Sequence, residues 1–252
     1  MENNQNKSVN AANVYTDYEG LNKTRAAKKV TFNTASARDY VTSEAFKTLR
    51  TNLFFSGGDM KSILITSCLE NEGKSTVATE LAKSVAESGK RTLLIDADMR
   101  KSVMIKKRDS HSVGIVGLSE ILSGMCSLED ALYQTQLENF DVIFSGPFPP
   151  NPVELIEIGK FDKLLERLKE TYDYIIIDSP PLGQVIDAAV IGSFCDAAIL
   201  VISGRRISRK LALDVKEQLQ KSGCKILGTV LNENEKRSSY TRSKYYGKYN
   251  YK

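Results

Sequence analysis

The stretch "SILITSCLENEGKSTVATELAKSVA" (residues 62–86) decides the fold. Its first six residues form an apolar run without alternation, which is typical of a strand covered on both faces. Its second half carries apolar residues at helical spacing. A polar segment, residues 68–73, joins the two and is followed by lysine and serine. A strand, a short polar loop and a helix in this order are the context that a phosphate-binding loop requires.

The loop matches the pattern GxxxxGK[ST] at its last three positions, Gly73, Lys74 and Ser75, while Cys68 stands at the first glycine. The loss of that glycine is tolerated if the backbone of Cys68 avoids positive φ. Backbone N–H groups at the start of the helix would cradle phosphates, Lys74 would neutralise the β- and γ-phosphates, and Ser75 would bind Mg²⁺. A chance Gly-Lys-Ser occurs in about one in ten chains of this length. The flanking strand and helix make chance a poor explanation.

Short β-rich runs recur along the rest of the chain, at residues 91–96, 140–146, 172–178, 197–203 and 225–232. Helical stretches separate them; one begins with Asn151 as N-cap and Pro152 as the first helical residue. This alternation predicts an α/β fold with a mostly parallel central sheet flanked by helices, of the P-loop NTPase class. In such sheets, binding sites lie beyond the carboxyl ends of the strands.

Aspartates stand at two of these strand ends. Asp96 closes the run 91–96 and Asp98 follows two residues later, whereas Asp178 closes the run 172–178. A single aspartate at a strand end more often caps the next loop. Three of them together with a Gly-Lys-Ser loop predict a nucleotide and magnesium site.

Composition narrows the classes of protein further. The chain has 252 residues, 41% of them hydrophobic, which suits one sizeable domain. It has no apolar run of 18 residues and no apolar N-terminal leader, so the sequence predicts a cytoplasmic protein. The four cysteines lack CxxC spacing and His111 is the single histidine, which excludes a zinc site.

The charge is uneven. Residues 236–252 carry six Lys and Arg and no acid, which leaves the rest of the chain at −2 although the whole is at +4. We predict a flexible arm at 1–38 because large apolar groups are few there, a P-loop domain at 39–235, and a disordered basic tail at 236–252. The tail holds five of the eleven tyrosines: Tyr240, Tyr245, Tyr246, Tyr249 and Tyr251.

Three of these segments together resemble a known family. "LITSCLENEGKST" (64–76), "TLLIDADMRKS" (92–102) and "YDYIIIDSPPLGQVIDAAVI" (172–191) are similar to the Walker A, A′ and B motifs of the bacterial tyrosine kinases, which autophosphorylate and act in capsular and exopolysaccharide synthesis. "PPNPVELI" (149–156) and "VLNENEKR" (230–237) fit the same pattern. The resemblance implies a deviant Walker A fold of the MinD and ParA type.

The resemblance also implies the site residues, with ATP and Mg²⁺ as cofactors. Nucleotide binding falls to Glu72, Gly73, Lys74, Ser75, Thr76 and Asn232, metal binding to Ser75, Asp96 and Asp178, and catalysis to Lys74, Asp96 and Asp98. Asp96 is the candidate base, although a metal role for it and a base role for Asp98 stay open. Asp187 is either an acid of the Walker B region or a helix start. The phosphate acceptors are the five tail tyrosines.

Partners follow from the same resemblance. A separate transmembrane activator would recruit the kinase to the inner face of the membrane, a cognate tyrosine phosphatase would reset the tail, and other proteins could serve as substrates. Glu44, Lys47 and Arg50 match the ExxRxxR motif of ring-shaped self-association, but Lys47 replaces the first arginine and loses its bidentate fork.

Two rival functions remain. A ParA- or MinD-like ATP-driven dimerisation switch shares the fold, but it needs a lysine where this chain has Leu69. A non-catalytic binder could use the basic tail on nucleic acid or an anionic membrane, with a steep dependence on salt. Such a tail would not need a nucleotide site, so no nucleic acid is expected.

Overall fold

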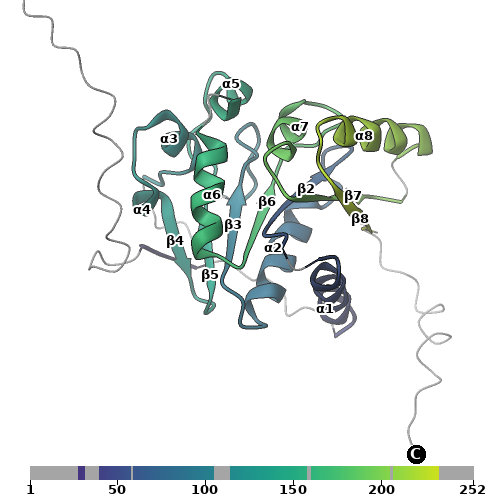
Figure 1. The fold of residues 1–252 in the computed structure, drawn as a ribbon, viewed down its shortest axis with the longest axis horizontal. Helices are drawn as coiled ribbons and strands as arrows, with labels where there is room; N and C mark the ends of the chain where they lie inside the picture. Colours follow the sequence, from purple (N-terminus) through teal and green to yellow (C-terminus); the bar gives the residue numbers. More distant parts are fainter. Residues whose placement is uncertain are drawn as a thin grey trace, which may run out of the picture.

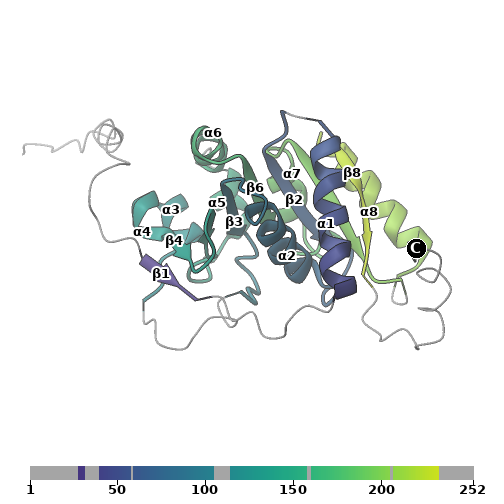
Figure 2. The ribbon, with the colours of Figure 1, turned by 90° about the horizontal axis from the view of Figure 1, so that it is seen from below.

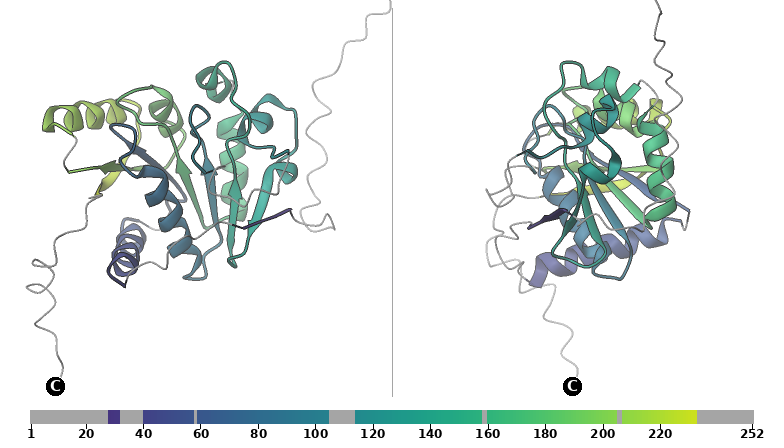
Figure 3. Two further views of the ribbon diagram at one scale, coloured as in Figure 1. Left: turned by 180° about the vertical axis from the view of Figure 1, so that it is seen from behind. Right: turned by 90° about the vertical axis from the view of Figure 1, so that its left-hand side faces the viewer.

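The computed structural model describes residues 28–31, 40–57, 59–104, 114–157, 160–204 and 207–232. They form one eight-stranded sheet with helices layered on both faces (Figures 1 and 3). The strands are β1 (Lys28–Val30), β2 (Ser62–Ser67), β3 (Thr92–Asp96), β4 (Leu132–Thr135), β5 (Phe140–Ile143), β6 (Tyr174–Asp178), β7 (Ala197–Ile202) and β8 (Ile226–Leu231). The helices are α1 (Tyr40–Phe55), α2 (Lys74–Ala86), α3 (Leu118–Ser123), α4 (Leu128–Ala131), α5 (Pro152–Glu157), α6 (Phe161–Thr171), α7 (Asp187–Gly192) and α8 (Arg209–Lys221).

The strand order is β1-β4-β5-β3-β6-β2-β7-β8. All neighbouring strands run parallel except β4 and β5, which are antiparallel. The mostly parallel sheet predicted from the alternation of elements is therefore confirmed. The sequence did not predict β4, nor β1, which lies within the predicted arm, forms an edge of the sheet and pairs with β4.

Two hydrophobic cores cover the sheet, one on each face. Ile63 and Ile65 of β2 face the core shared with α1 and α2, whereas Leu64 faces the core shared with α3 and with α5 to α8. Successive residues of a strand point to opposite faces, so an apolar run fills both cores. Figure 2 shows α1 and α2 together on one face.

The strand order brings the predicted motifs together. β6 lies between β2 and β3, and the register pairs Asp96 of β3 with Asp178 of β6. β2, which leads into the phosphate-binding loop, pairs with β6 through Ile65 and Asp178. Segments that are up to about a hundred residues apart in the chain thus end at one edge of the sheet, where α/β folds bind ligands.

Candidate functional site

The loop between β2 and α2 has the backbone of a phosphate cradle. Asn71 and Gly73 adopt left-handed φ angles of 63° and 89°, and α2 begins at Lys74. Glycine takes such angles without strain, and asparagine tolerates them better than most residues. Cys68 is buried and does not have a positive φ, so the condition for replacing the first glycine is met.

Glu72 shapes the loop through its side chain. One carboxylate oxygen accepts a hydrogen bond from the Leu69 N–H and the other accepts one from the Ser203 N–H, both at 2.7 Å. Because the side chain is fully buried in these contacts, only the backbone of Glu72 is left for a nucleotide. Asn232 Nδ2 donates to the Glu72 carbonyl oxygen at 2.8 Å, which places the end of β8 against the loop.

Lys74 lies among the carboxylates at the ends of β3 and β6. Its ammonium group is 2.9 Å from Asp98 Oδ2, 3.7 Å from Asp178 Oδ1 and 3.3 Å from Ser75 Oγ. Burial works to lower the pKa of Lys74, but Asp178 and Asp98 raise it more, so the pKa lies above its ordinary value. Lys74 is therefore a cation held at the point where phosphates would enter.

The three aspartates lie at different depths. Asp98 lines the pocket, whereas Asp96 and Asp178 are not among its lining residues and are 0% and 1% exposed. Asp96 accepts hydrogen bonds from the Ser102 hydroxyl and, at 3.2 Å, from the Asp98 N–H. Burial first, and then the neighbouring Asp178, raise the pKa of Asp96 to about 8. Two carboxylates this close favour a cation between or beside them.

The residues present fit Mg²⁺. Magnesium usually takes one or two carboxylates together with hydroxyl, water and phosphate oxygens. The Ser75 hydroxyl and the buried carboxylates of Asp96 and Asp178 offer such a set. Across the described ranges, no group of three or more His, Cys, Asp or Glu forms a protein-only metal cage.

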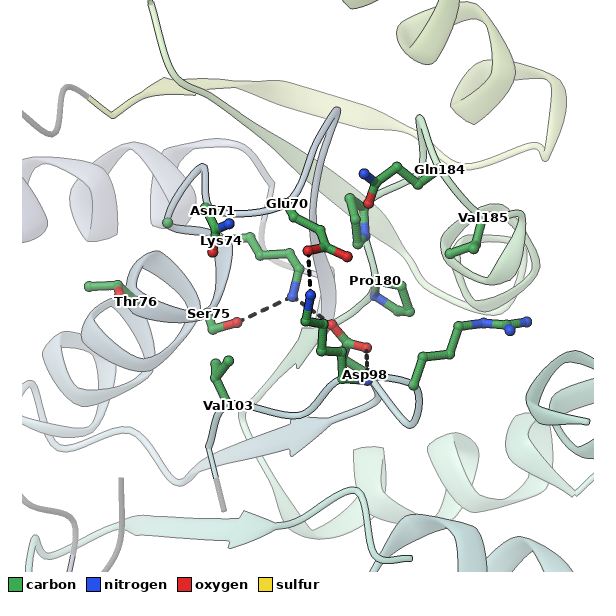
Figure 4. Close-up of a pocket in the computed structure, with 14 residues that line it drawn as sticks. Glu70, Asn71, Lys74, Ser75, Thr76, Asp98, Val103, Pro180, Gln184 and Val185 are labelled. Carbon is green, nitrogen blue, oxygen red and sulfur yellow. Dashed lines mark hydrogen bonds and ion pairs between the residues drawn. The ribbon is translucent and has the colours of Figure 1, made fainter. Parts of the chain in front are cut away.

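A pocket of about 430 Å³ opens above these groups (Figure 4). The phosphate-binding loop and the start of α2 form one side of it, and residues 180–185 form the other. Lys101 and Glu70 make an ion pair of 2.6 Å between the two loops that carry them. The lining residues that sequence reasoning missed are Glu70, Asn71, Arg100, Lys101, Val103, Pro180, Pro181, Gln184 and Val185.

Asp187 is both the start of α7 and part of an ion pair. Arg100 donates from Nε and Nη2 to its two carboxylate oxygens, at 2.8 and 3.1 Å. Asp187 is buried, and it is the first residue of α7. The pair joins the loop after β3 to the loop after β6.

The proposed self-association residues lie on α1. Glu44 and Lys47 pair with each other at 2.8 Å on the exposed face. Arg50 instead donates to the Ser84 carbonyl oxygen of α2 at 2.7 Å, so part of its hydrogen-bonding capacity is used within the chain. The five tail tyrosines lie outside the described residues. Over the described ranges, no helix is long and apolar enough to cross a membrane.

Comparisons with known proteins agree with this geometry. A family model described as an AAA domain matches residues 60–222. The tyrosine-protein kinase CpsD of Streptococcus agalactiae is 46% identical over 208 residues, which cover 82% of this chain and 90% of the relative.

Solved structures show the same fold. The kinase domain of the Escherichia coli tyrosine kinase ETK has a TM-score of 0.76 at 32% identity, with 87% of this chain and 86% of that chain covered. The chimeric protein CapA2B2 has a TM-score of 0.75 at 32% identity, covering 84% and 95%. The septum site-determining protein MinD of Pyrococcus horikoshii, complexed with Mg-ADP, is more distant, with a TM-score of 0.57 at 27% identity and coverage of 73% and 76%. The chain therefore belongs to the bacterial tyrosine-protein kinases of the CpsD type.

Proposed function

We propose that this chain transfers the γ-phosphoryl group of ATP to the tyrosines of its own C-terminal tail and thereby regulates the synthesis of a capsular or exopolysaccharide. The observation that carries the proposal is the position of Lys74, which extends from a phosphate-binding loop to within 2.9 Å of Asp98 and 3.7 Å of Asp178. A cation, a carboxylate acceptor for protons and a metal-binding carboxylate are what phosphoryl transfer needs from a protein. The relatives named as tyrosine kinases support the acceptor class.

The loop would hold the donor. The backbone N–H groups of residues 71–76 would surround the phosphates, Lys74 would neutralise charge on the β- and γ-phosphates, and Asn232 would lie near the adenine. Ser75, Asp96 and Asp178 would hold Mg²⁺, which screens the phosphate charge when it is bound. The complex of the structural neighbour MinD with Mg-ADP supports this cofactor pair.

The acceptor hydroxyl needs help because the pKa of tyrosine is near 10 and the neutral phenol is a weak nucleophile. We assign Asp98 as the proton acceptor, since it lines the pocket while Asp96 lies beneath it. As the phenolic oxygen bonds to the γ-phosphorus, its proton passes to Asp98. The bond from that phosphorus to the β-phosphate oxygen breaks, and ADP leaves with the electron pair.

The tail can reach a neighbouring subunit. Asn232 is the last described residue, and Tyr245 follows 13 residues later. At about 3.3–3.6 Å per residue, an extended segment of this length spans tens of Å. We therefore propose transfer between subunits of a homo-oligomer, with Glu44, Lys47 and Arg50 at the contact.

A transmembrane activator would bring the kinase to the inner face of the membrane. One solved relative, CapA2B2, is a chimeric protein. This supports a kinase that works with a second protein. A cognate tyrosine phosphatase would reverse the modification, and other proteins could serve as further substrates.

Two incubations with Mg-ATP test the proposal, each with and without the cytoplasmic segment of the activator. In the first, removal of residues 240–252 should abolish most phosphotyrosine while ADP affinity stays unchanged. In the second, this truncated enzyme should label a full-length Lys74→Met partner, because the partner retains its tail. Phosphotyrosine that persists at wild-type level after truncation would contradict the tail as acceptor.

A further inference from the structure

The phosphate-binding loop supplies little of the positive charge that a triphosphate attracts. Residues 68–74 contain one cation, Lys74, and its ammonium group is already 2.9 Å from Asp98 Oδ2, which offsets part of its charge. Leu69 stands at the position where the ParA- and MinD-like switches need a lysine. During phosphoryl transfer, negative charge is spread over the oxygens of the γ-phosphate, and cations stabilise it. A further cation is therefore required beside the terminal phosphate.

Of the described residues that line the pocket, Arg100 and Lys101 are the cations outside the loop. Arg100 donates two hydrogen bonds to Asp187, whose side chain is 2% exposed, and moving it would leave a buried carboxylate without its cation. Lys101 pairs with Glu70 at 2.6 Å, and these two side chains are 71% and 40% exposed. An exposed ion pair contributes little to stability, so another anion can take the place of Glu70.

The backbone of Lys101 is fixed beside the proposed site of transfer. Its N–H donates to Asp98 Oδ1 at 3.0 Å, while the other oxygen of this carboxylate contacts Lys74. One aspartate thus lies between the two lysines. Figure 4 shows Glu70 extending from the phosphate-binding loop, with its carboxylate turned toward the ends of Lys74 and Asp98. Glu70 therefore places a negative charge on the side of the pocket where the terminal phosphate of a bound nucleotide would bring its own.

We propose that Lys101 exchanges Glu70 for the γ-phosphate of ATP and returns to Glu70 when the site holds ADP. This inference rests on the proposed function, because it requires that the loop binds ATP. ADP ends at the β-phosphate, which the loop N–H groups and Lys74 would hold, so it offers Lys101 no terminal phosphate. Lys101 thereby favours ATP over ADP, and Glu70 sets the cost of the exchange. The contact is lost once the γ-phosphoryl group has been transferred, which favours release of ADP.

The test measures binding rather than transfer. Calorimetry on the full-length protein, at physiological ionic strength, compares the affinity for Mg-ADP with that for the magnesium complex of AMP-PNP, a non-hydrolysable analogue of ATP. Lys101→Met removes the cation and keeps most of the side-chain length, and Glu70→Gln removes the competing charge at nearly the same shape. The double variant combines the two changes. Lys216→Met is the matched control, because Lys216 is an exposed lysine of α8 that does not line the pocket.

Lys101→Met should weaken AMP-PNP binding at least about tenfold, because it removes a hydrogen bond between charged groups. Its affinity for Mg-ADP should stay within about twofold, since an exposed charge that touches no phosphate is largely screened by salt. Glu70→Gln should tighten AMP-PNP binding a few-fold, as expected when an exposed competitor is removed. This gain should disappear in the double variant, and Lys216→Met should match the wild type.

Equal losses of AMP-PNP and ADP affinity in Lys101→Met would overturn the exchange, because they would indicate a general attraction for phosphates. An unchanged affinity of Lys101→Met for AMP-PNP would overturn it as well. So would a gain from Glu70→Gln that persists in the double variant, because Glu70 would then act without Lys101. A wild-type protein that binds neither nucleotide would instead refute the proposed function.

Discussion

The ammonium group of Lys74 lies 2.9 Å from Asp98 Oδ2, so the lysine that would bind phosphate is already paired with a carboxylate of the next strand end. Incoming phosphates must compete with Asp98 for this cation, and Asp98 also repels them. We therefore expect Asp98→Asn to bind Mg-ADP a few-fold more tightly than the wild type. The same change should lower tyrosine phosphorylation by about 10² or more, because it removes the carboxylate that we propose as the proton acceptor. Calorimetry and a phosphotyrosine assay on one preparation measure both effects, and a parallel loss of the two would contradict these roles.

Gly73 lies in the loop at a position with little room for a side chain. Its φ is 89°, and a Cβ there would lie 2.0 Å from Asn232 Nδ2. Gly73→Ala should therefore abolish Mg-ADP binding and cost about 1–3 kcal/mol of stability through backbone strain. Gly89→Ala is the matched control, since Gly89 has a φ of 84° and nothing within 4 Å of an added Cβ. Gly89→Ala should lose stability without losing nucleotide affinity. Equal nucleotide affinity in the two variants would show that the clash between an added Cβ at residue 73 and Asn232 does not affect binding.

Asp196 connects the start of β2 with α6, at the end of the strands opposite the candidate site. It accepts hydrogen bonds from the Lys61 and Ser62 N–H groups and pairs with Lys169 at 2.9 Å. Burial works to raise the pKa of Asp196, but the hydrogen bonds from Ser62, Lys169 and Lys61 outweigh it and hold the pKa below its ordinary value. Asp196→Ala should cost about 1–3 kcal/mol at pH 7 because buried donors lose their acceptor.

This contribution depends on pH in a defined direction. A carboxyl whose pKa is depressed on folding stabilises the protein above its unfolded pKa, near 4, and the stabilisation is lost as pH falls through the folded pKa. The stability gap between wild type and Asp196→Ala in denaturant titrations should therefore narrow below about pH 4. Glu166→Ala is the control, because Glu166 contacts the same Lys169 but its side chain is 75% exposed. A gap that widens on acidification would contradict the assignment.

Arg100 and Lys101 are adjacent but should contribute unequally to stability. Arg100 pairs with Asp187, whose side chain is 2% exposed, whereas Lys101 pairs with Glu70 at the surface. Arg100→Ala leaves a buried carboxylate without its cation and should cost about 1–3 kcal/mol. Lys101→Ala should change stability by less than about 1 kcal/mol. Urea titrations of the two variants measure the difference, and similar losses would refute a structural role for the Arg100 pair.

Much of the fold could be predicted because its signals are local. Short apolar, β-rich runs predicted six strands, and the Gly-Lys-Ser loop between a strand and a helix predicted the phosphate cradle. The edge strand β1 and its neighbour β4 could not be predicted because they are short and only partly apolar, and their pairing depends on the tertiary neighbour. The position of Asn71 in the left-handed region was equally hidden, since only the loop geometry requires it.

The charged residues of the site could be predicted from the sequence, whereas the apolar residues that line the pocket could not. Lys74, Asp98 and Asp178 follow from motif positions at strand ends, and the strand order brings them together. The apolar residues Val103 and Val185 carry no such signal, because a valine in a loop has many possible roles. For Glu72 the motif position was misleading about the side chain. The position predicted a ligand contact, but the carboxylate accepts hydrogen bonds from backbone N–H groups.

We propose that the Lys74 site phosphorylates the tail tyrosines. The most direct test is tandem mass spectrometry of the full-length protein after incubation with Mg-ATP and the cytoplasmic segment of the activator, for the wild type and for Lys74→Met. The wild type should carry phosphate on residues among Tyr240, Tyr245, Tyr246, Tyr249 and Tyr251, and Lys74→Met, correctly folded by circular dichroism, should carry none. Phosphotyrosine on the tail of Lys74→Met incubated alone would contradict a catalytic role for the Lys74 site.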